Sequence, residues 1–121
     1  MGTINGSITD ISGGLGNRTV VKSTWYEMAL NDEGAAMKMT EWADRSVQVV
    51  GTFGAGGSVA IEGSLDGTNF ATLSDPQGNA LTIQTAKIEA ITELVQFIRP
   101  RVTGGDGTTS LTVTIMCRRT K

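Results

Sequence analysis

The chain has 121 residues and a formal net charge of −2, and it contains no histidine and a single cysteine. This length predicts one domain, and the missing histidine excludes Ser-His and Cys-His catalytic pairs and zinc sites of the usual ligand set. The slightly acidic balance argues against a nucleic-acid-binding surface, and no apolar run approaches the ~20 residues of a membrane-spanning helix.

The composition favours an all-β domain. Glycine accounts for 16 residues, proline for 2, and charged residues for 18% of the chain. Glycine suits tight turns, whereas the abundant threonine and valine suit pleated strands. The cysteine, Cys117, ends an alternating apolar run and is expected to pack as a small hydrophobic residue. No secretory signal is visible, so we expect synthesis in the cytoplasm.

The first segment, residues 1–17, is rich in glycine. Its apolar residues fall at helical spacing; they are Ile4, Ile8, Ile11 and Leu15. The glycines and threonines among them, however, disfavour a helix. We interpret the segment as an extended, flexible arm whose apolar side chains dock on a neighbour. A disordered terminus and an edge strand of the same domain are the alternatives. Residues 18–121 then form the β domain.

Strand patterns follow in close succession. Residues 19–30 are rich in β-branched and aromatic residues, and residues 35–43 read as a strand or a short helix, the strand being favoured. Residues 46–53 and 58–64 alternate apolar and polar residues with the period of a half-buried strand. The glycine-rich link between these two runs predicts a hairpin.

The second half of the chain continues this pattern. Short strands are expected over residues 69–73 and 81–84, separated by a DPQGN turn, and residues 88–95 fit either a strand or a short helix. Strands over 97–103 and 111–118 are joined by a glycine-rich loop, which again predicts a hairpin. In such a hairpin Arg99 and Arg101 lie on the face that carries Thr112 and Thr114, which is exposed to solvent or to a partner.

Few patterns indicate chemistry. The carboxylates are scattered singly without catalytic spacing, so we expect no enzyme, no metal and no cofactor. Asp66 and Asp106 each precede a glycine, which predicts hairpin turns in preference to calcium loops. The aromatic residues Trp25, Tyr26 and Trp42 are expected in a core or interface, with a sugar-stacking platform as the alternative.

Three segments resemble a known family: VAIEGSLDGTNFATL at 59–73, DPQGNAL at 75–81 and FIRPRVTGGDGTTSLTVTI at 97–115. They are similar to the capsid decoration, or cement, proteins of tailed bacteriophages. About eight strands with short turns already suggest a two-sheet sandwich or jelly roll, and the resemblance implies the same jelly-roll-like, two-sheet β-sandwich. The same run of strands and turns is also similar to galactose-binding-like β-sandwiches, which supports the jelly roll in either case.

The resemblance further implies a non-enzymatic role on the capsid exterior of the virion. Proteins of this family attach as homodimers or homotrimers and clamp neighbouring copies of the major capsid protein, without nucleic acid or membrane as partners. The candidate partner contacts are the apolar residues of the arm and two arginines: Ile4, Ile8, Ile11, Leu15, Arg99 and Arg101. A carbohydrate-binding β-sandwich module and a tail-associated virion protein are the alternative functions.

Overall fold

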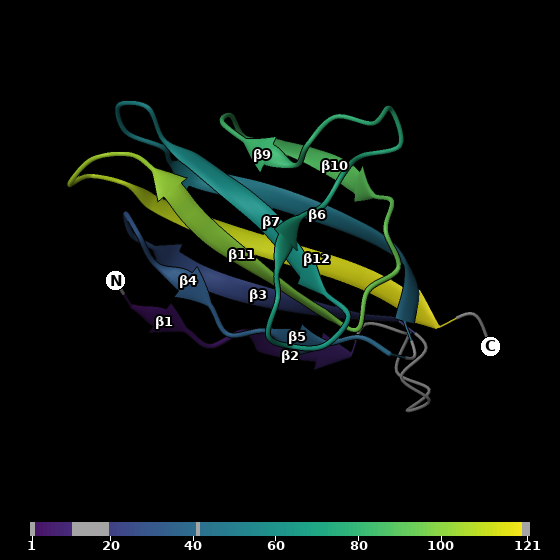
Figure 1. Ribbon diagram of the computed structural model, residues 1–121. Helices are drawn as coiled ribbons and strands as arrows, with labels where there is room; N and C mark the ends of the chain where they lie inside the picture. Colours follow the sequence, from purple (N-terminus) through teal and green to yellow (C-terminus); the bar gives the residue numbers. More distant parts are fainter. Residues whose placement is uncertain (1, 11–19, 41, 120–121) are drawn as a thin grey trace.

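The computed structural model describes residues 2–10, 20–40 and 42–119, and within these residues all regular structure is β-strand. Two sheets pack face to face (Figure 1). The first sheet, sheet A, contains β1 (Thr3–Ile4), β4 (Glu33–Gly34), β5 (Met37–Lys38), β7 (Ser58–Ser64), β8 (Ala71–Thr72), β9 (Thr82–Ile83) and β11 (Phe97–Gly104). Sheet B contains β2 (Ser7–Asp10), β3 (Val20–Met28), β6 (Trp42–Thr52), β10 (Lys87–Ile91) and β12 (Ser110–Arg119). The described part of the chain therefore offers no helix that could cross a membrane.

The strand pairing is that of a jelly roll. Apart from β1 and β2, the described residues form eight strands when the fragments β4 and β5 count as one and β8 and β9 as another. The first of these pairs with the last (β3 with β12), the second with the seventh (β4/β5 with β11), the third with the sixth (β6 with β10) and the fourth with the fifth (β7 with β8/β9). This nested antiparallel pairing confirms the predicted all-β, jelly-roll-like sandwich.

Both predicted hairpins are wrong. The link 53–57 carries the chain from β6 in sheet B to β7 in sheet A, and the link 105–109 carries it back from β11 to β12. Alternation identifies the buried face of a strand but not the strands beside it. The strands on either side of each link were therefore predicted to pair with each other, and they do not. As a result Arg101 and Thr114 lie on the outer faces of opposite sheets, not on one shared face.

Pro100 marks a break in sheet A. Because proline has no N–H to donate to a neighbouring strand, it favours an edge strand or a position whose amide would face outward. In the structure β11 lies between β7 and the pair β4/β5. On the β4/β5 side the ladder stops after Ile98 opposite Met37 and resumes with Arg101 opposite Glu33. The strand is internal, and the neighbour beside the proline is split in two.

The core lies between the sheets. Its centre consists of fully buried side chains contributed by both layers, which are Trp25, Met28, Met39, Val47, Val49, Val59, Ile61, Ile98, Leu111, Val113 and Ile115. Cys117 is buried, as predicted. Met37 and Met39 both face the core. In the region 88–95, which fitted either a strand or a short helix, the structure has a strand, β10, over Lys87–Ile91.

The N-terminal segment is paired with the domain over its described part. β1 adds to β4 in sheet A, and β2 adds to β3 in sheet B, so the edge-strand alternative describes residues 3–10. Between them the chain crosses from one sheet to the other at Gly6, where a Cβ would lie 2.5 Å from Ser23 Oγ. Whether residues 1–17 also act as an arm toward a neighbour stays a prediction.

The sandwich has two ends, which differ in the links they carry. The arch end consists of the links 53–57 and 105–109, which lie together on the left of Figure 1. The leucine end, at the opposite end of the strands, consists of the links 65–70 and 92–96 and is named for Leu65 and Leu94.

Candidate functional site

The two arginines singled out in the sequence lie side by side on the outer face of sheet A. Both bind Glu62 on the neighbouring strand, with 3.0 Å from Arg99 Nε to Oε1 and 3.0 Å from Arg101 Nε to Oε2. Arg99 also approaches Glu33 on its other side, at 3.1 Å from Nη1 to Oε2. Two carboxylates therefore compensate the two guanidinium groups.

The link after β7 contacts this cluster. The Arg99 guanidinium lies over the ring of Phe70, with 3.8 Å from Cζ to the ring centroid. Glu62 is 5% exposed, and its hydrogen bond raises the pKa of Arg101. The first role of this cluster is structural, because its ion pairs link neighbouring strands of sheet A. The proposed contact of Arg99 and Arg101 with an acidic partner stays a prediction, and such a partner would compete with Glu62.

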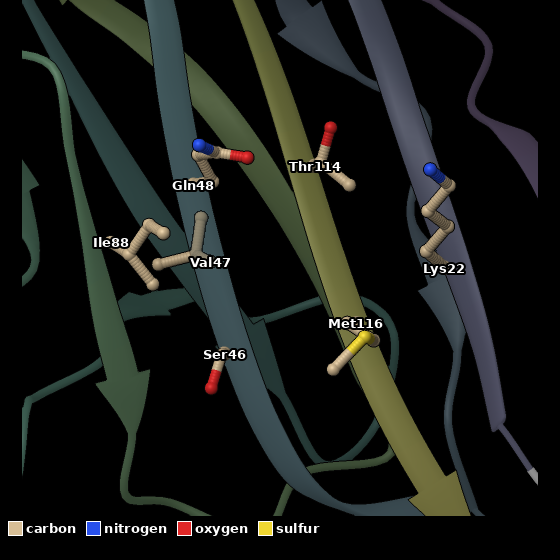
Figure 2. Close-up of a pocket in the computed structure, with 7 residues that line it drawn as sticks. All are labelled: Lys22, Ser46, Val47, Gln48, Ile88, Thr114 and Met116. Atoms are coloured by element: carbon tan, nitrogen blue, oxygen red, sulfur yellow. The ribbon is translucent and has the colours of Figure 1, made fainter.

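The outer face of sheet B is chemically different. Figure 2 shows one part of it, where a hollow of about 300 Å³ is lined by polar side chains and two exposed apolar ones. On its surface lie Lys22, Ser46, Gln48, Ile88, Thr114 and Met116. Ile88 is 65% exposed and Met116 44%. This face offers a broad, lightly charged sheet surface.

Among the described residues, the two large apolar side chains with the highest exposed fractions lie at the leucine end. Leu65 is 72% exposed and Leu94 is 71% exposed. Both line one open depression of about 480 Å³, together with Thr40, Val95 and Gln96. Isolated exposed leucines are ordinary on protein surfaces, but two of them around one depression form an apolar patch that suits a protein partner.

Arg45 anchors the link that carries Leu94. Its guanidinium donates to the carbonyl of Glu93 and, at 2.9 Å, to the carbonyl of Trp42, and it lies 3.5 Å from the carbonyl of Val95. The amide of Gln96 donates to the Ser64 carbonyl at 3.0 Å. The backbone on both sides of Leu94 is therefore held in place while its side chain points outward.

The anchor is a buried cation. Arg45 is 4% exposed, burial lowers its pKa, and its Nε has no hydrogen-bond partner among the described residues. It lies near Cys117, whose pKa burial raises to about 11, so this thiol stays protonated at neutral pH. An inward-facing arginine that binds backbone carbonyls is a structural clamp for the link above it.

A second set of hydrogen bonds holds the link that carries Leu65. The Ser64 hydroxyl donates to Asp66 Oδ1 at 2.8 Å and accepts the amide of Gly67 at 2.8 Å. Asp66 in turn accepts the amides of Thr68 and Asn69, and these bonds hold its pKa well below the usual range. The predicted Asp-Gly turn is confirmed here.

The calcium alternative gains no support from the described residues. Among them there is no group of three or more acidic, cysteine or histidine residues arranged to hold a metal ion. Asp106 also serves a turn: it accepts the amide of Ala55 at 2.9 Å and that of Thr108 at 2.8 Å. These bonds lower the pKa of Asp106 to about 2.

The sugar-platform alternative is contradicted for the proposed set of aromatic residues. Trp25 is fully buried and donates its indole N–H to the Ala35 carbonyl at 3.1 Å. Trp42 is partly buried against the core, and Tyr26 is 58% exposed. The three rings therefore do not form a shared exposed surface, and the expected core placement holds for Trp25.

The candidate contact residues of the N-terminal segment differ in their burial. Ile4 is half-buried and packs against the core, whereas Ile8 is 54% exposed. Ile11 and Leu15 lie outside the described residues.

Sequence reasoning missed the leucine end. Arg45 could have been found, because it continues the inward-facing series of Val47 and Val49 two residues earlier.

Fold and surfaces together define a jelly-roll β-sandwich that presents an apolar end. No protein-family model matches the sequence, and no curated protein matches it. Among solved structures, the chain is similar to the SPBc2 prophage-derived protein YomS, with a TM-score of 0.60 and 9% identity over 81% of this chain and 93% of that one. This likeness is one of fold. Protein NMB1881 from Neisseria meningitidis matches with a TM-score of 0.42 and 11% identity, over 95% of this chain and 82% of that one.

Proposed function

We propose that this protein is a non-enzymatic structural protein of a tailed-phage virion, bound to the capsid exterior and bridging neighbouring copies of the major capsid protein. The resemblance of residues 59–73, 75–81 and 97–115 to capsid decoration proteins supports this role. A fold shared with a protein named as prophage-derived is in keeping with it.

The observation that carries the proposal is the apolar leucine end on anchored links. Full burial of a leucine side chain contributes roughly 1.5–3 kcal/mol. Leu65 and Leu94 leave most of that gain unrealised in the isolated protein, and a partner that covers them recovers it. Because Arg45 and Asp66 already hold the two links, little conformational entropy is lost on docking.

A bridging role also needs more than one contact. Homo-oligomers supply it, since a second attached subunit binds at a high effective concentration and strengthens weak individual contacts. We therefore include self-association in the proposed function, with the capsid surface as the common support.

The test is the addition of purified protein to expanded empty capsids of the phage or prophage that encodes this protein. Sedimentation followed by quantitative gel analysis is expected to show saturable, stoichiometric binding. Binding to purified tails alone would instead favour a tail-associated protein. Binding to neither particle, or sugar-dependent quenching of tryptophan fluorescence with a hit on a glycan array, would contradict the proposal.

A further inference from the structure

β10 forms one edge of sheet B. Its ladder to β6 runs from Lys87 opposite Val49 to Ile91 opposite Arg45. In the part of the chain that the structure describes, no other strand pairs with β10. The strand has no proline and no register shift, so its outer edge presents a regular row of backbone donors and acceptors.

The side chains of β10 are sorted by face. Lys87 and Glu89 lie opposite Val49 and Val47, so they are on the face toward sheet A, where they form an ion pair with 3.3 Å from Nζ to Oε2. Ile88 lies opposite Gln48 on the outer face and is 65% exposed. The edge therefore carries one cation and one anion on its inner face, with an exposed isoleucine between them on its outer face.

We propose that a second copy of this protein pairs with this edge, β10 antiparallel to β10. The two-fold axis passes between the Ile88 residues of the two copies, which lie opposite each other. In this register Lys87 of each copy lies opposite Glu89 of the other, and the two Ile88 side chains meet on the outer face. Opposite charges directly across an antiparallel pair stabilise it, as do paired β-branched residues. The two five-stranded sheets become one continuous sheet.

The charges also select the register. An axis through Glu89 places the two glutamates opposite each other, and an axis through Lys87 does the same for the lysines; both arrangements are repulsive. Charges on the inward face of an edge strand also discourage pairing with unrelated strands. The alternating signs on β10 make its own copy the matching partner.

The predicted contact is small, because β10 has five residues. Interfaces below about 1,200 Å² are typical of weak, reversible association, so the dimer is expected to depend on protein concentration. The inference rests on the self-association included in the proposed function. Dimerisation is measured without a capsid, so capsid binding and dimerisation can fail independently.

The experiment is sedimentation velocity over a concentration series with wild type, Lys87→Glu, Glu89→Lys and an equimolar mixture of these two variants. Each variant alone places like charges opposite each other twice, so its dimer dissociation constant is expected to rise about tenfold or more. In the mixture the register pairs Glu with Lys at both positions, so a dimer of the two variants is expected to return.

Lys38→Glu supplies the matched control, because it makes the same charge change at an exposed position of sheet A and is expected to dimerise like wild type. Circular dichroism checks that every variant is folded. A wild type that stays monomeric would overturn the inference. So would a dimer that tolerates both β10 variants, or a mixture that fails to dimerise.

Discussion

The two ends of the sandwich are held in similar ways but present different surfaces. At the arch end Asp106 binds the amide of Ala55, and the Thr109 hydroxyl binds the Phe53 carbonyl at 2.8 Å. The exposed residues there are small or polar. At the leucine end Arg45 anchors one link from inside, and the exposed side chains include two leucines, Leu65 and Leu94. Both ends are anchored, so they differ in what they expose, and the proposed binding surface is the anchored end that exposes leucines.

The largest expected effect concerns the anchor of the leucine end. Arg45→Ala removes the hydrogen bonds that a charged donor makes to the carbonyls of Glu93, Trp42 and Val95, and a hydrogen bond to a charged group contributes about 1.5–3 kcal/mol. We expect the free energy of unfolding to fall by about 3 kcal/mol, measured by urea denaturation.

The matched control is Arg118→Ala. Its ion pair with Asp44 is exposed, with 2.6 Å from Nη2 to Oδ2, and such pairs contribute about 1 kcal/mol or less. Hydrogen exchange is expected to rise over residues 92–96 in Arg45→Ala and to stay unchanged at the arch end. Equal loss of protection at both ends would remove the distinction between them.

A smaller effect is expected from glycine substitutions at the arch end. Gly54 has φ +73° and Gly56 has φ +68°, so alanine at either position costs about 1 kcal/mol through its backbone alone. At Gly54 the new Cβ would also lie 2.4 Å from Asp106 Oδ1, whereas nothing lies within 4 Å at Gly56.

Gly54→Ala is therefore expected to lose about 2 kcal/mol of stability and Gly56→Ala about 1 kcal/mol, both by urea denaturation. Similar losses for the two variants would show that the Asp106 bond to the other link adds nothing to the arch end.

The smallest effect is the pH dependence of that bond. The pKa of Asp106 is about 2 in the folded protein, below the ~3.9 of an unperturbed aspartate. Its contribution to stability is therefore present above about pH 4 and is lost as the pH falls toward 2.

We expect Asp106→Asn to melt a few degrees below wild type at pH 6, with the gap closing near pH 2 in thermal scans. Asp66 is present in both proteins, so its own titration cancels from the difference. A gap that is constant with pH would contradict the role assigned to the Asp106 carboxylate.

The sequence predicted what depends on local periodicity. Alternation correctly placed Val47, Val49, Ile98 and Val102 in the core, and Asp-Gly turn chemistry correctly placed Asp66 in a turn. These assignments need no knowledge of which strands are neighbours. The jelly roll itself was predicted from the number of strands with short turns and from the family resemblance, and not from the alternation.

Strand pairing could not be predicted in the same way. A short glycine-rich link can join neighbours in one sheet or cross between two sheets, and the residues in links 53–57 and 105–109 do not distinguish these cases. The partner of Arg99 and Arg101 was missed for the same reason: Glu62 is distant in sequence and becomes a neighbour only through the β7–β11 ladder. The exposure of Leu65 and Leu94 likewise depends on how the two links meet at one end.

The central claim, that the leucine end binds the partner, is tested most directly by capsid affinity. The double variant Leu65→Ser/Leu94→Ser is compared with Tyr26→Ser/Val50→Ser, which removes two exposed apolar side chains from sheet B. Loss of both leucines is expected to weaken binding to expanded capsids roughly 10- to 100-fold, while the control binds like wild type. Wild-type affinity in the folded leucine variant, or a loss confined to the control, would contradict the account.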